Sequence, residues 1–315
     1  MNLAGVFAET LNVTLPVFAM VFMGLALKRI GWIDRTFIDT ASALVFKATM
    51  PTLIFLSLIH ADMEQAFDPK LMAFFGLTTV ALFLLSWAWS LWRVSPADRG
   101  VYVQGAFRGN CGIVGLALAA GMYGDYGLSA GGLLLGVVIL SYNILSVFVL
   151  VIHGGRERAN WHHIFRHIAL NPLILAVLAA LPFMWFQITL PTWLMTSGEY
   201  FASLTLPLAL ICIGGTLSIR GIKESRHVAI GASLMKMVTL PILGTLASWW
   251  AGFSGRQLGL LFLYFASPTA AASFVMVKAM GGNAKLAANI IAISTLLASL
   301  TITGGVFALR ALDLI

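Results

Sequence analysis

The sequence predicts an all-α protein that crosses a membrane many times, on three observations. Hydrophobic residues make up 60% of the 315 positions and charged residues only 10%, whereas soluble domains carry about 25% charged residues. Apolar stretches of about 20 residues, the length that crosses the hydrocarbon core of a bilayer, recur along the whole chain. All twelve carboxylates fall in loops or near the ends of these stretches. The length permits ten spans with short loops, so residues 1–315 are expected to form a single membrane domain.

The apolar windows place the ten spans as two sets of five. The first set covers 8–27, 37–59, 70–92, 100–122 and 128–152, and the second covers 166–186, 192–218, 227–251, 257–280 and 285–309. Residues 1–8 lack the basic segment that begins a signal peptide, so the first span is expected to be retained. Cys111 and Cys212 both lie inside spans, and we expect reduced, packed thiols rather than a disulfide framework.

Basic residues in the loops fall mainly on one side of the predicted membrane, which places both termini on the periplasmic or extracellular face. The other side carries three, Lys70, Arg256 and Arg310. The richer side carries thirteen, namely Lys28, Arg29, Arg35, Arg93, Arg99, Arg156, Arg158, Arg166, Arg220, Lys223, Arg226, Lys278 and Lys285. This bias also explains the formal charge of +7 without a nucleic-acid partner, and it predicts a multi-pass protein of the cell inner membrane.

The two halves of the chain repeat each other. Pro16 and Met50-Pro51 match Pro172 and Leu206-Pro207 at a separation of 156 residues, and Asn110 matches Pro268 at 158. Gly124-Asp125 likewise matches Gly282-Asn283. Five spans in each half require opposite orientations, which is typical of secondary transporters. We expect repeat one over about 1–153, a cytoplasmic loop over about 154–165, and repeat two over about 166–315.

Two spans at corresponding places in the repeats carry residues that interrupt helices. The fourth contains Arg108-Gly109-Asn110-Cys111-Gly112, and the ninth contains Ala266-Ser267-Pro268-Thr269. Glycine costs about 1 kcal/mol relative to alanine in a helix, and proline removes a hydrogen bond. Each break alone fits a packing kink. A matched pair indicates a binding site near the middle of the bilayer, because half-helix N-termini attract anions and C-terminal carbonyls attract cations.

Four segments resemble the auxin efflux carrier family, and in particular its bacterial malonate and organic-anion carriers. The segments begin at Met50-Pro51-Thr52-Leu53, at Phe107-Arg108-Gly109-Asn110, at Leu206-Pro207-Leu208-Ala209 and at Ala266-Ser267-Pro268-Thr269. Plant members differ by a long central loop and by a proline where this chain has Cys111-Gly112. These departures favour a bacterial-type member over an auxin carrier.

The resemblance implies a ten-span inverted repeat similar to the bile-acid symporter fold. In that fold broken helices four and nine cross beside the substrate. A mobile core, here spans 3, 4, 5, 8, 9 and 10, slides against a scaffold of spans 1, 2, 6 and 7 that forms a homodimer. The family's substrate-facing asparagines correspond to Asn110 and Asn143.

Three cations lie inside spans without an acidic neighbour, and each has two interpretations. Arg108 either binds a substrate carboxylate in a bidentate manner or fixes the broken helix by donating to free carbonyls. Lys47, four residues before Pro51, either provides positive charge for an anion or extends along a cavity toward water. Lys236 either replaces a coupling cation when protonated, since lysine protonation responds readily to burial, or is likewise a snorkelling side chain.

Uncharged candidates surround these cations in the sequence. Asn143 is either a substrate ligand or a hydrogen bond between helices. Pro51 and Pro207 are expected to be kinks rather than ligands. The full set of expected substrate-binding residues is Arg108, Asn110, Cys111, Gly112, Asn143, Ser267, Pro268 and Thr269.

The sequence therefore favours a secondary carrier for small mono- or dicarboxylates, without cofactor or metal. Three histidines, His162, His163 and His167, fit an interfacial amphipathic helix better than a metal site. A cation/proton antiporter or sodium-coupled symporter of the same fold is the first alternative, but antiporters need a buried carboxylate. A membrane-embedded sensor or enzyme is the second, and no catalytic motif supports it.

Overall fold

The computed structural model describes residues 3–60, 67–154, 170, 172–217 and 226–315, and in this part of the chain all the extended elements are helices. The first half comprises α1 (Leu3–Arg29), α2 (Arg35–Leu44), η1 (Val45–Thr49), α3 (Met50–Ile59), α5 (Pro69–Arg93), α6 (Arg99–Phe107), η2 (Cys111–Gly115) and α7 (Leu116–Gly154). The second half comprises α9 (Pro172–Phe186), α10 (Thr192–Ser203), α11 (Thr205–Thr216), α12 (Arg226–Leu234), η3 (Met235–Thr239), α13 (Leu240–Trp250), α14 (Gly255–Phe265), α15 (Ala272–Ala279) and α16 (Ala284–Ala311).

Long apolar helices confirm a polytopic membrane protein. Within the described residues, seven helical stretches are long and apolar enough to cross a membrane, and Pro172–Phe186 is a shorter apolar helix. Helices occur in each of the ten ranges expected from the sequence. The count of ten spans and their inverted repeat stay predictions. The histidine-rich segment expected as an interfacial helix, with most of the loop at 154–165, lies outside the described residues.

Prolines and one glycine interrupt the helices. The π-helical segments η1 and η3 come directly before α3 and α13, whose first turns contain Pro51 and Pro241. Since proline has no amide hydrogen and clashes with the preceding turn, a wider turn at this point accommodates the lost bond. Near Pro207 the chain instead ends α10 and begins α11. Gly124, with φ 55° and ψ −130°, turns the chain inside α7.

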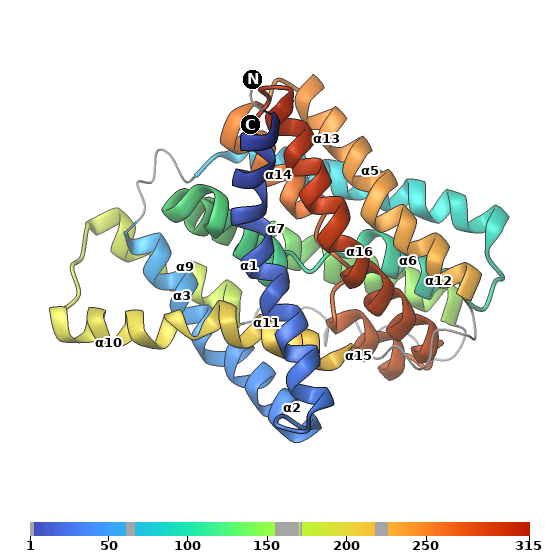
Figure 1. Cartoon of the computed structure of the whole chain (residues 1–315), viewed down its shortest axis with the longest axis horizontal. Helices are drawn as coiled ribbons and strands as arrows, with labels where there is room; N and C mark the ends of the chain where they lie inside the picture. Colours follow the sequence, from blue (N-terminus) through green and yellow to red (C-terminus); the bar gives the residue numbers. More distant parts are fainter. Residues whose placement is uncertain (1–2, 61–66, 155–169, 171, 218–225) are drawn as a thin grey trace.

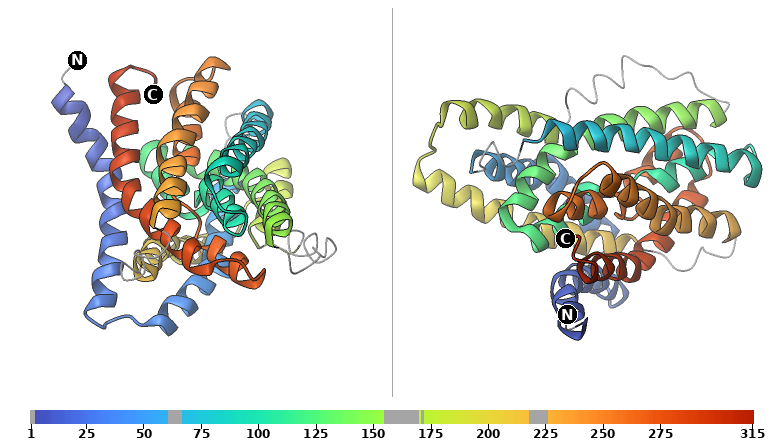
Figure 2. Two further views of the ribbon diagram at one scale, coloured as in Figure 1. Left: turned by 90° about the vertical axis from the view of Figure 1, so that its right-hand side faces the viewer. Right: turned by 90° about the horizontal axis from the view of Figure 1, so that it is seen from above.

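Close backbone contact joins α1 to α11. A Cβ on Gly214 would lie 1.8 Å from the Val21 carbonyl oxygen, and one on Gly24 would lie 2.0 Å from that of Ile211. Small residues at helix contacts let backbones approach where no hydrophobic effect drives association. The α1 helix packs on α16 as well, and Figures 1 and 2 show the two ends of the chain together at one end of these helices.

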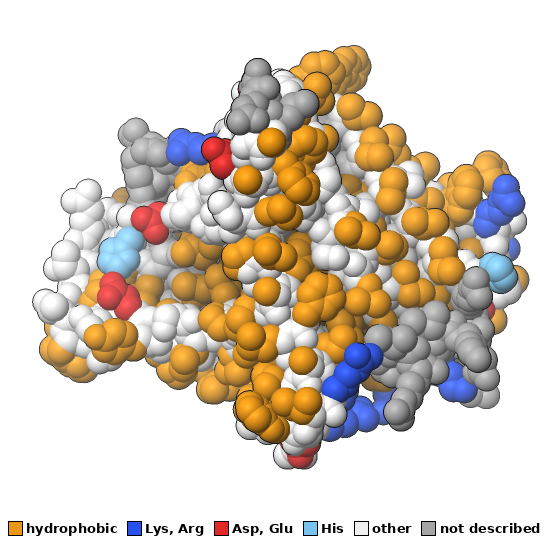
Figure 3. All heavy atoms as spheres, viewed as in Figure 1, with side chains coloured by type: hydrophobic (Ala, Val, Ile, Leu, Met, Phe, Trp, Pro, Cys, Tyr) orange, Lys and Arg blue, Asp and Glu red, His pale blue; other side chains and the backbone are white. Residues whose placement is uncertain are grey.

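Helix contacts fall into two groups. One group joins α1, α2, α3, α9, α10 and α11, and the other joins α5, α6, α7, α12, α13, α14, α15 and α16. Contacts of α7 with α1, α3 and α9, and of α1 with α16, connect the groups. Hydrophobic side chains cover most of the face seen in Figure 3, with Lys and Arg side chains near its edges. This distribution suits a surface surrounded by lipid.

Candidate functional site

The two interrupted helices meet and hydrogen-bond to each other. The amide of Asn110 donates to the Pro268 carbonyl oxygen at 2.6 Å, and the amide of Ala270 donates to the Arg108 carbonyl oxygen at 3.0 Å. Gly109 and Thr269 face each other as an isolated antiparallel bridge. Each break thereby satisfies backbone groups that the other leaves free. The C-terminal ends of α6 and α14 and the N-terminal ends of η2 and α15 come together here.

A cavity of about 860 Å³ lies beside this crossover. One wall comes from α6, η2, α7 and α15, and carries Arg108, Asn110 and Asn143. The opposite wall comes from α2, η1, α3, α9 and α11, and its side chains are mainly apolar: Val45, Phe46, Met50, Leu173, Ala209 and Ile213. The cavity thus lies between the two groups of helices and is polar mainly on one side.

Arg108 is the charged side chain among the described residues that line this cavity, and it is 8% exposed. Its guanidinium donates to Asn143 Oδ1 at 3.1 Å, to Ser146 Oγ at 3.3 Å and to the sulfur of Met276. All three acceptors are neutral. None of the carboxylates that the structure describes is buried. The positive charge of Arg108 is therefore solvated by dipoles but not neutralised, and an anion in the cavity would neutralise it.

Two helix N-termini open into the same cavity. Gly112 and Ile113 belong to the first turn of η2, and Ala271 and Ala272 to the start of α15, and all four line the cavity. Neither N-cap residue, Asn110 or Ala271, makes a side-chain capping hydrogen bond. The first amides of a helix lack intrahelical partners and carry the positive end of its dipole, so both ends favour an anion.

The structure brings five of the eight expected binding residues to the cavity: Arg108, Asn110, Cys111, Gly112 and Asn143. The other three lie in the crossover, but they are not among the lining residues. Ser267 Oγ donates to the Leu263 carbonyl, Thr269 Oγ1 donates to that of Gly105, and the Pro268 carbonyl accepts the Asn110 amide. Thr269 and Pro268 therefore join the two breaks, whereas Ser267 bonds within its own segment.

The expected cations and kinks occupy separate places. Lys47 lies in η1 with an exposed side chain and is not among the cavity-lining residues. Lys236 lies in η3 and is 1% exposed, beside the crossover but away from the large cavity. Pro51 follows η1, and Pro207 follows the interruption between α10 and α11. Both prolines thus lie at irregular helix segments.

Sequence reasoning missed three contributors to the site. Ser146 and Met276 hold Arg108, and Ala270–Ala272 form the α15 end of the cavity wall. Ser146 follows Asn143 by three residues, hence on the same helix face, which was an available signal. The alanines directly follow the break at Pro268, so the half-helix argument applied to them too. Nothing in the sequence pairs Met276 with Arg108. In the described residues no group of three or more His, Cys, Asp or Glu side chains is placed to hold a metal.

Comparison with known proteins identifies the family. The pattern that defines the membrane transport protein family matches residues 11–305. The chain belongs to this family, that of the auxin efflux carriers. It is accordingly a membrane transport protein and not an enzyme.

Relatives from archaea and bacteria match almost the whole chain. An uncharacterized transporter of Methanothermobacter thermautotrophicus is 25% identical over 93% of this chain and 96% of its own length. One of Methanocaldococcus jannaschii is 25% identical over the same shares. A Rhizobium meliloti protein with the name "Putative malonate transporter" is 27% identical over 96% of this chain and 97% of its own.

Proposed function

We propose that this membrane transport protein is a secondary carrier of small organic anions. The observation that carries the proposal is Arg108, a buried cation with neutral partners, facing a cavity into which two helix N-termini open. A carboxylate there accepts charge-assisted hydrogen bonds from the guanidinium and from free backbone amides. Asn110 and Asn143 orient the rest of the solute. The relative with a malonate transporter's name supports an organic anion as the substrate class.

The lining favours a solute with one carboxylate and an apolar body. Arg108 supplies the single positive charge of the described lining, and most other side chains there are aliphatic. A dicarboxylate places its second charge against Val45, Leu173 or Ile213, where desolvation is costly. The volume of about 860 Å³ also lies near the upper end of the range for small-molecule sites, about 300–1,000 Å³. Malonate and malate fill little of it.

The two walls of the cavity support an elevator type of alternating access. The polar ligands of the proposed site all lie on α6, η2 and α7, in the group that also contains α5 and α12 to α16. The facing wall, from α2 and α3 through α9 and α11, offers the solute mainly apolar contact. A core that slides along this wall carries its solute without breaking specific hydrogen bonds to it. We therefore assign the first group as the mobile core and the second as the scaffold.

Placement in the membrane completes the proposal. The loop charges support both termini outside the inner membrane, and both ends of the chain lie at the same end of the molecule (Figure 1). We further propose that two copies associate through the scaffold helices. Native mass spectrometry of the detergent-solubilised protein tests this association, and a monomer at all concentrations contradicts it.

Uptake into proteoliposomes tests the function. Labelled malonate, malate, indole-acetate and 4-methyl-2-oxopentanoate are offered with and without a pH gradient, against protein-free vesicles. We expect saturable uptake of at least one anion, with monocarboxylates preferred over dicarboxylates. Neither saturable uptake nor saturable binding of any of the four would contradict the proposal. Malonate uptake that monocarboxylates do not inhibit would contradict the substrate preference alone.

A further inference from the structure

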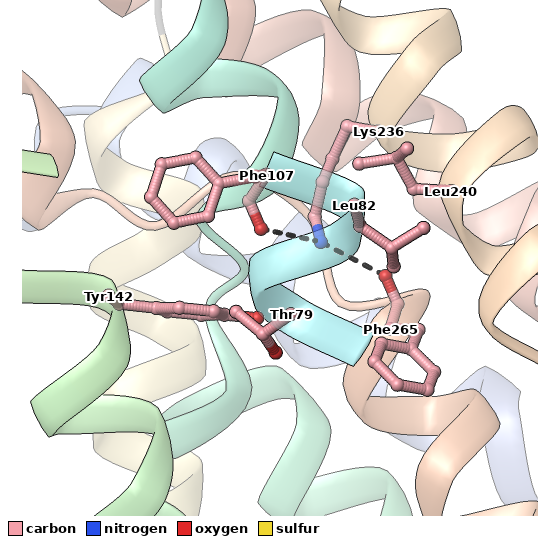
Figure 4. Close-up of a pocket in the computed structure, with 7 residues that line it drawn as sticks. All are labelled: Thr79, Leu82, Phe107, Tyr142, Lys236, Leu240 and Phe265. Atoms are coloured by element: carbon pink, nitrogen blue, oxygen red, sulfur yellow. Dashed lines mark hydrogen bonds between the residues drawn. The ribbon is translucent and has the colours of Figure 1, made fainter. Parts of the chain in front are cut away.

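A second buried cation, Lys236, contacts the crossover but does not line the large cavity. The ammonium of Lys236 donates to the Phe265 carbonyl oxygen at 3.0 Å and to the Phe107 carbonyl oxygen at 3.5 Å. Figure 4 shows the side chain reaching between these two carbonyls. Phe107 is the last residue of α6, and Phe265 is the last residue of α14. Lys236 thus joins the C-terminal ends of both interrupted helices.

The charge of this ammonium is matched by backbone dipoles. The C-terminus of a helix carries about half a negative charge, so two converging C-termini supply about one. None of the described carboxylates is buried, so within the described residues backbone dipoles, and not an acidic side chain, balance the charge of Lys236. Gly109 also fits closely here, since an added Cβ would lie 3.0 Å from Lys236 Nζ. The ammonium therefore packs directly against the backbone of the crossover.

A small cavity lies beside the Lys236 side chain. Its volume is about 10 Å³, and its lining includes Thr79, Tyr142 and Lys236. A single water requires about 10–15 Å³, so the space left beside the ammonium is at most about one water in size. A second cation there would be repelled by the positive charge of the lysine. Thr79 is 3% exposed, and its Oγ1 has no hydrogen-bond partner in the described structure. Two carbonyl oxygens therefore hold the ammonium group, and the Thr79 hydroxyl lies in the wall of the same small cavity.

The predicted internal repeat relates the positions of Thr79 and Lys236. Thr79 and Lys236 are 157 residues apart, between the separations of 156 and 158 that relate the matched motifs of the two halves. Both line the same small cavity. The second repeat therefore places an ammonium where the first places a hydroxyl. Hydroxyl groups at both equivalent positions would suit a free cation. In this chain the ammonium of Lys236 takes the place of one hydroxyl.

We propose that Lys236 is a tethered cation of the crossover, occupying the position of a free alkali cation, so that the carrier works without Na⁺ or K⁺. This inference rests on the proposed carrier function for its role in transport, but not for the occupancy of the site. Removing the side chain beyond Cβ leaves the two carbonyls facing an empty space, with Thr79 in the wall of the adjoining small cavity. An alkali cation, or propylammonium, which replaces the atoms lost in Lys236→Ala, then has a place to bind.

Thermal unfolding of the purified protein in detergent tests this proposal. Wild-type protein and Lys236→Ala are compared in NaCl, KCl, propylammonium chloride and choline chloride at equal ionic strength. We expect the wild-type Tm to be the same in all four salts. For Lys236→Ala we expect one of the three small cations to raise Tm saturably, by about 5 °C at concentrations far above its Kd.

Matched variants separate this effect from general salt effects. Lys47→Ala removes an exposed lysine from the equivalent π-helical setting and should gain no cation response. Adding Thr79→Val to Lys236→Ala removes one oxygen at constant shape and should weaken the response. If Lys236→Ala does not yield monodisperse protein, Lys236→Met is measured instead, since its apolar stem fills most of the space and leaves the position of the ammonium open.

Two results would overturn the inference. One is saturable stabilisation of the wild-type protein by Na⁺ or K⁺, which would mean that the lysine does not replace a free cation. The other is a folded Lys236 variant that responds to no cation. Because unfolding is measured without any organic anion, failure of the uptake assay would contradict the proposed function and leave this result standing.

Discussion

Replacing Arg108 by glutamine is the sharpest test of the anion site. The change removes the positive charge of the cavity lining and its bonds to Asn143 and Ser146, while keeping a polar side chain, shorter than arginine. Hydrogen bonds to charged groups contribute about 1.5–3 kcal/mol each. Losing most of a bidentate pair between Arg108 and the carboxylate should therefore cost about 2–4 kcal/mol of binding free energy. At about 1.4 kcal/mol per tenfold, Kd for the anion should rise about 30- to 700-fold.

The same change should leave the protein folded. Breaking a buried ion pair destabilises a protein because it leaves the other charge unpaired. Arg108 has only neutral partners among the described residues, so Arg108→Gln leaves no such charge. We therefore expect an unchanged elution profile and a Tm close to that of the wild-type protein. Arg108→Lys, which keeps the charge but loses the planar fork, should weaken binding about tenfold.

Binding is measured by isothermal titration with the anion that the uptake assay selects, and uptake is then measured in proteoliposomes. Arg93→Gln, on an exposed arginine in the last turn of α5, is the matched control and should leave Kd unchanged. A folded Arg108→Gln protein with wild-type affinity would show that Arg108 only supports the broken helix. In that case the two helix N-termini alone would have to hold the carboxylate.

Further substitutions test the rest of the site and the packing. Asn110→Ala should abolish uptake in a folded, monodisperse protein, because Asn110 lines the cavity at the start of η2; retained transport would remove the crossover from the site. Asn143→Ala should raise Kd about three- to tenfold, by loss of a neutral hydrogen bond to the solute and of one acceptor of Arg108, whereas an unchanged Kd would remove Asn143 from the site. Gly214→Ala should lower Tm because its Cβ meets the Val21 carbonyl, while Gly304→Ala, with open space around it, should not; equal effects of the two on Tm would contradict the close packing of α1 on α11.

The interrupted helices were predictable from the sequence because their causes are local. Proline removes a backbone donor wherever it lies in a helix, and glycine and asparagine favour helix ends over helix interiors. The segment around Arg108-Gly109-Asn110 and the segment around Pro268 therefore predicted the two helix breaks. Their separation by 158 residues, close to the repeat length, predicted that they belong together. The direct hydrogen bonds between them agree with that expectation.

Which residues of the crossover face the cavity, and which bond only to the backbone, was not predictable in the same way. Ser267 and Thr269 look like solute ligands in the sequence, but the structure uses their hydroxyls on the Leu263 and Gly105 carbonyls. Which side of a break faces a cavity depends on how two distant helices cross, and no local pattern records that. Met276 illustrates the same limit, since its contact with Arg108 joins residues 168 positions apart.

The antiparallel pairing of the two breaks gives the two buried cations of the proposed site different surroundings. It brings together two helix N-termini that line the large cavity and two helix C-termini that Lys236 contacts. The N-terminal side carries positive dipole ends, and Arg108 adds a full charge there, so this side strongly favours an anion. The C-terminal side carries negative dipole ends, which would repel that anion and weaken the crossover if left unmatched. In the proposed arrangement Lys236 neutralises these ends from within the chain, so that the anion binds without a second solute to balance the backbone.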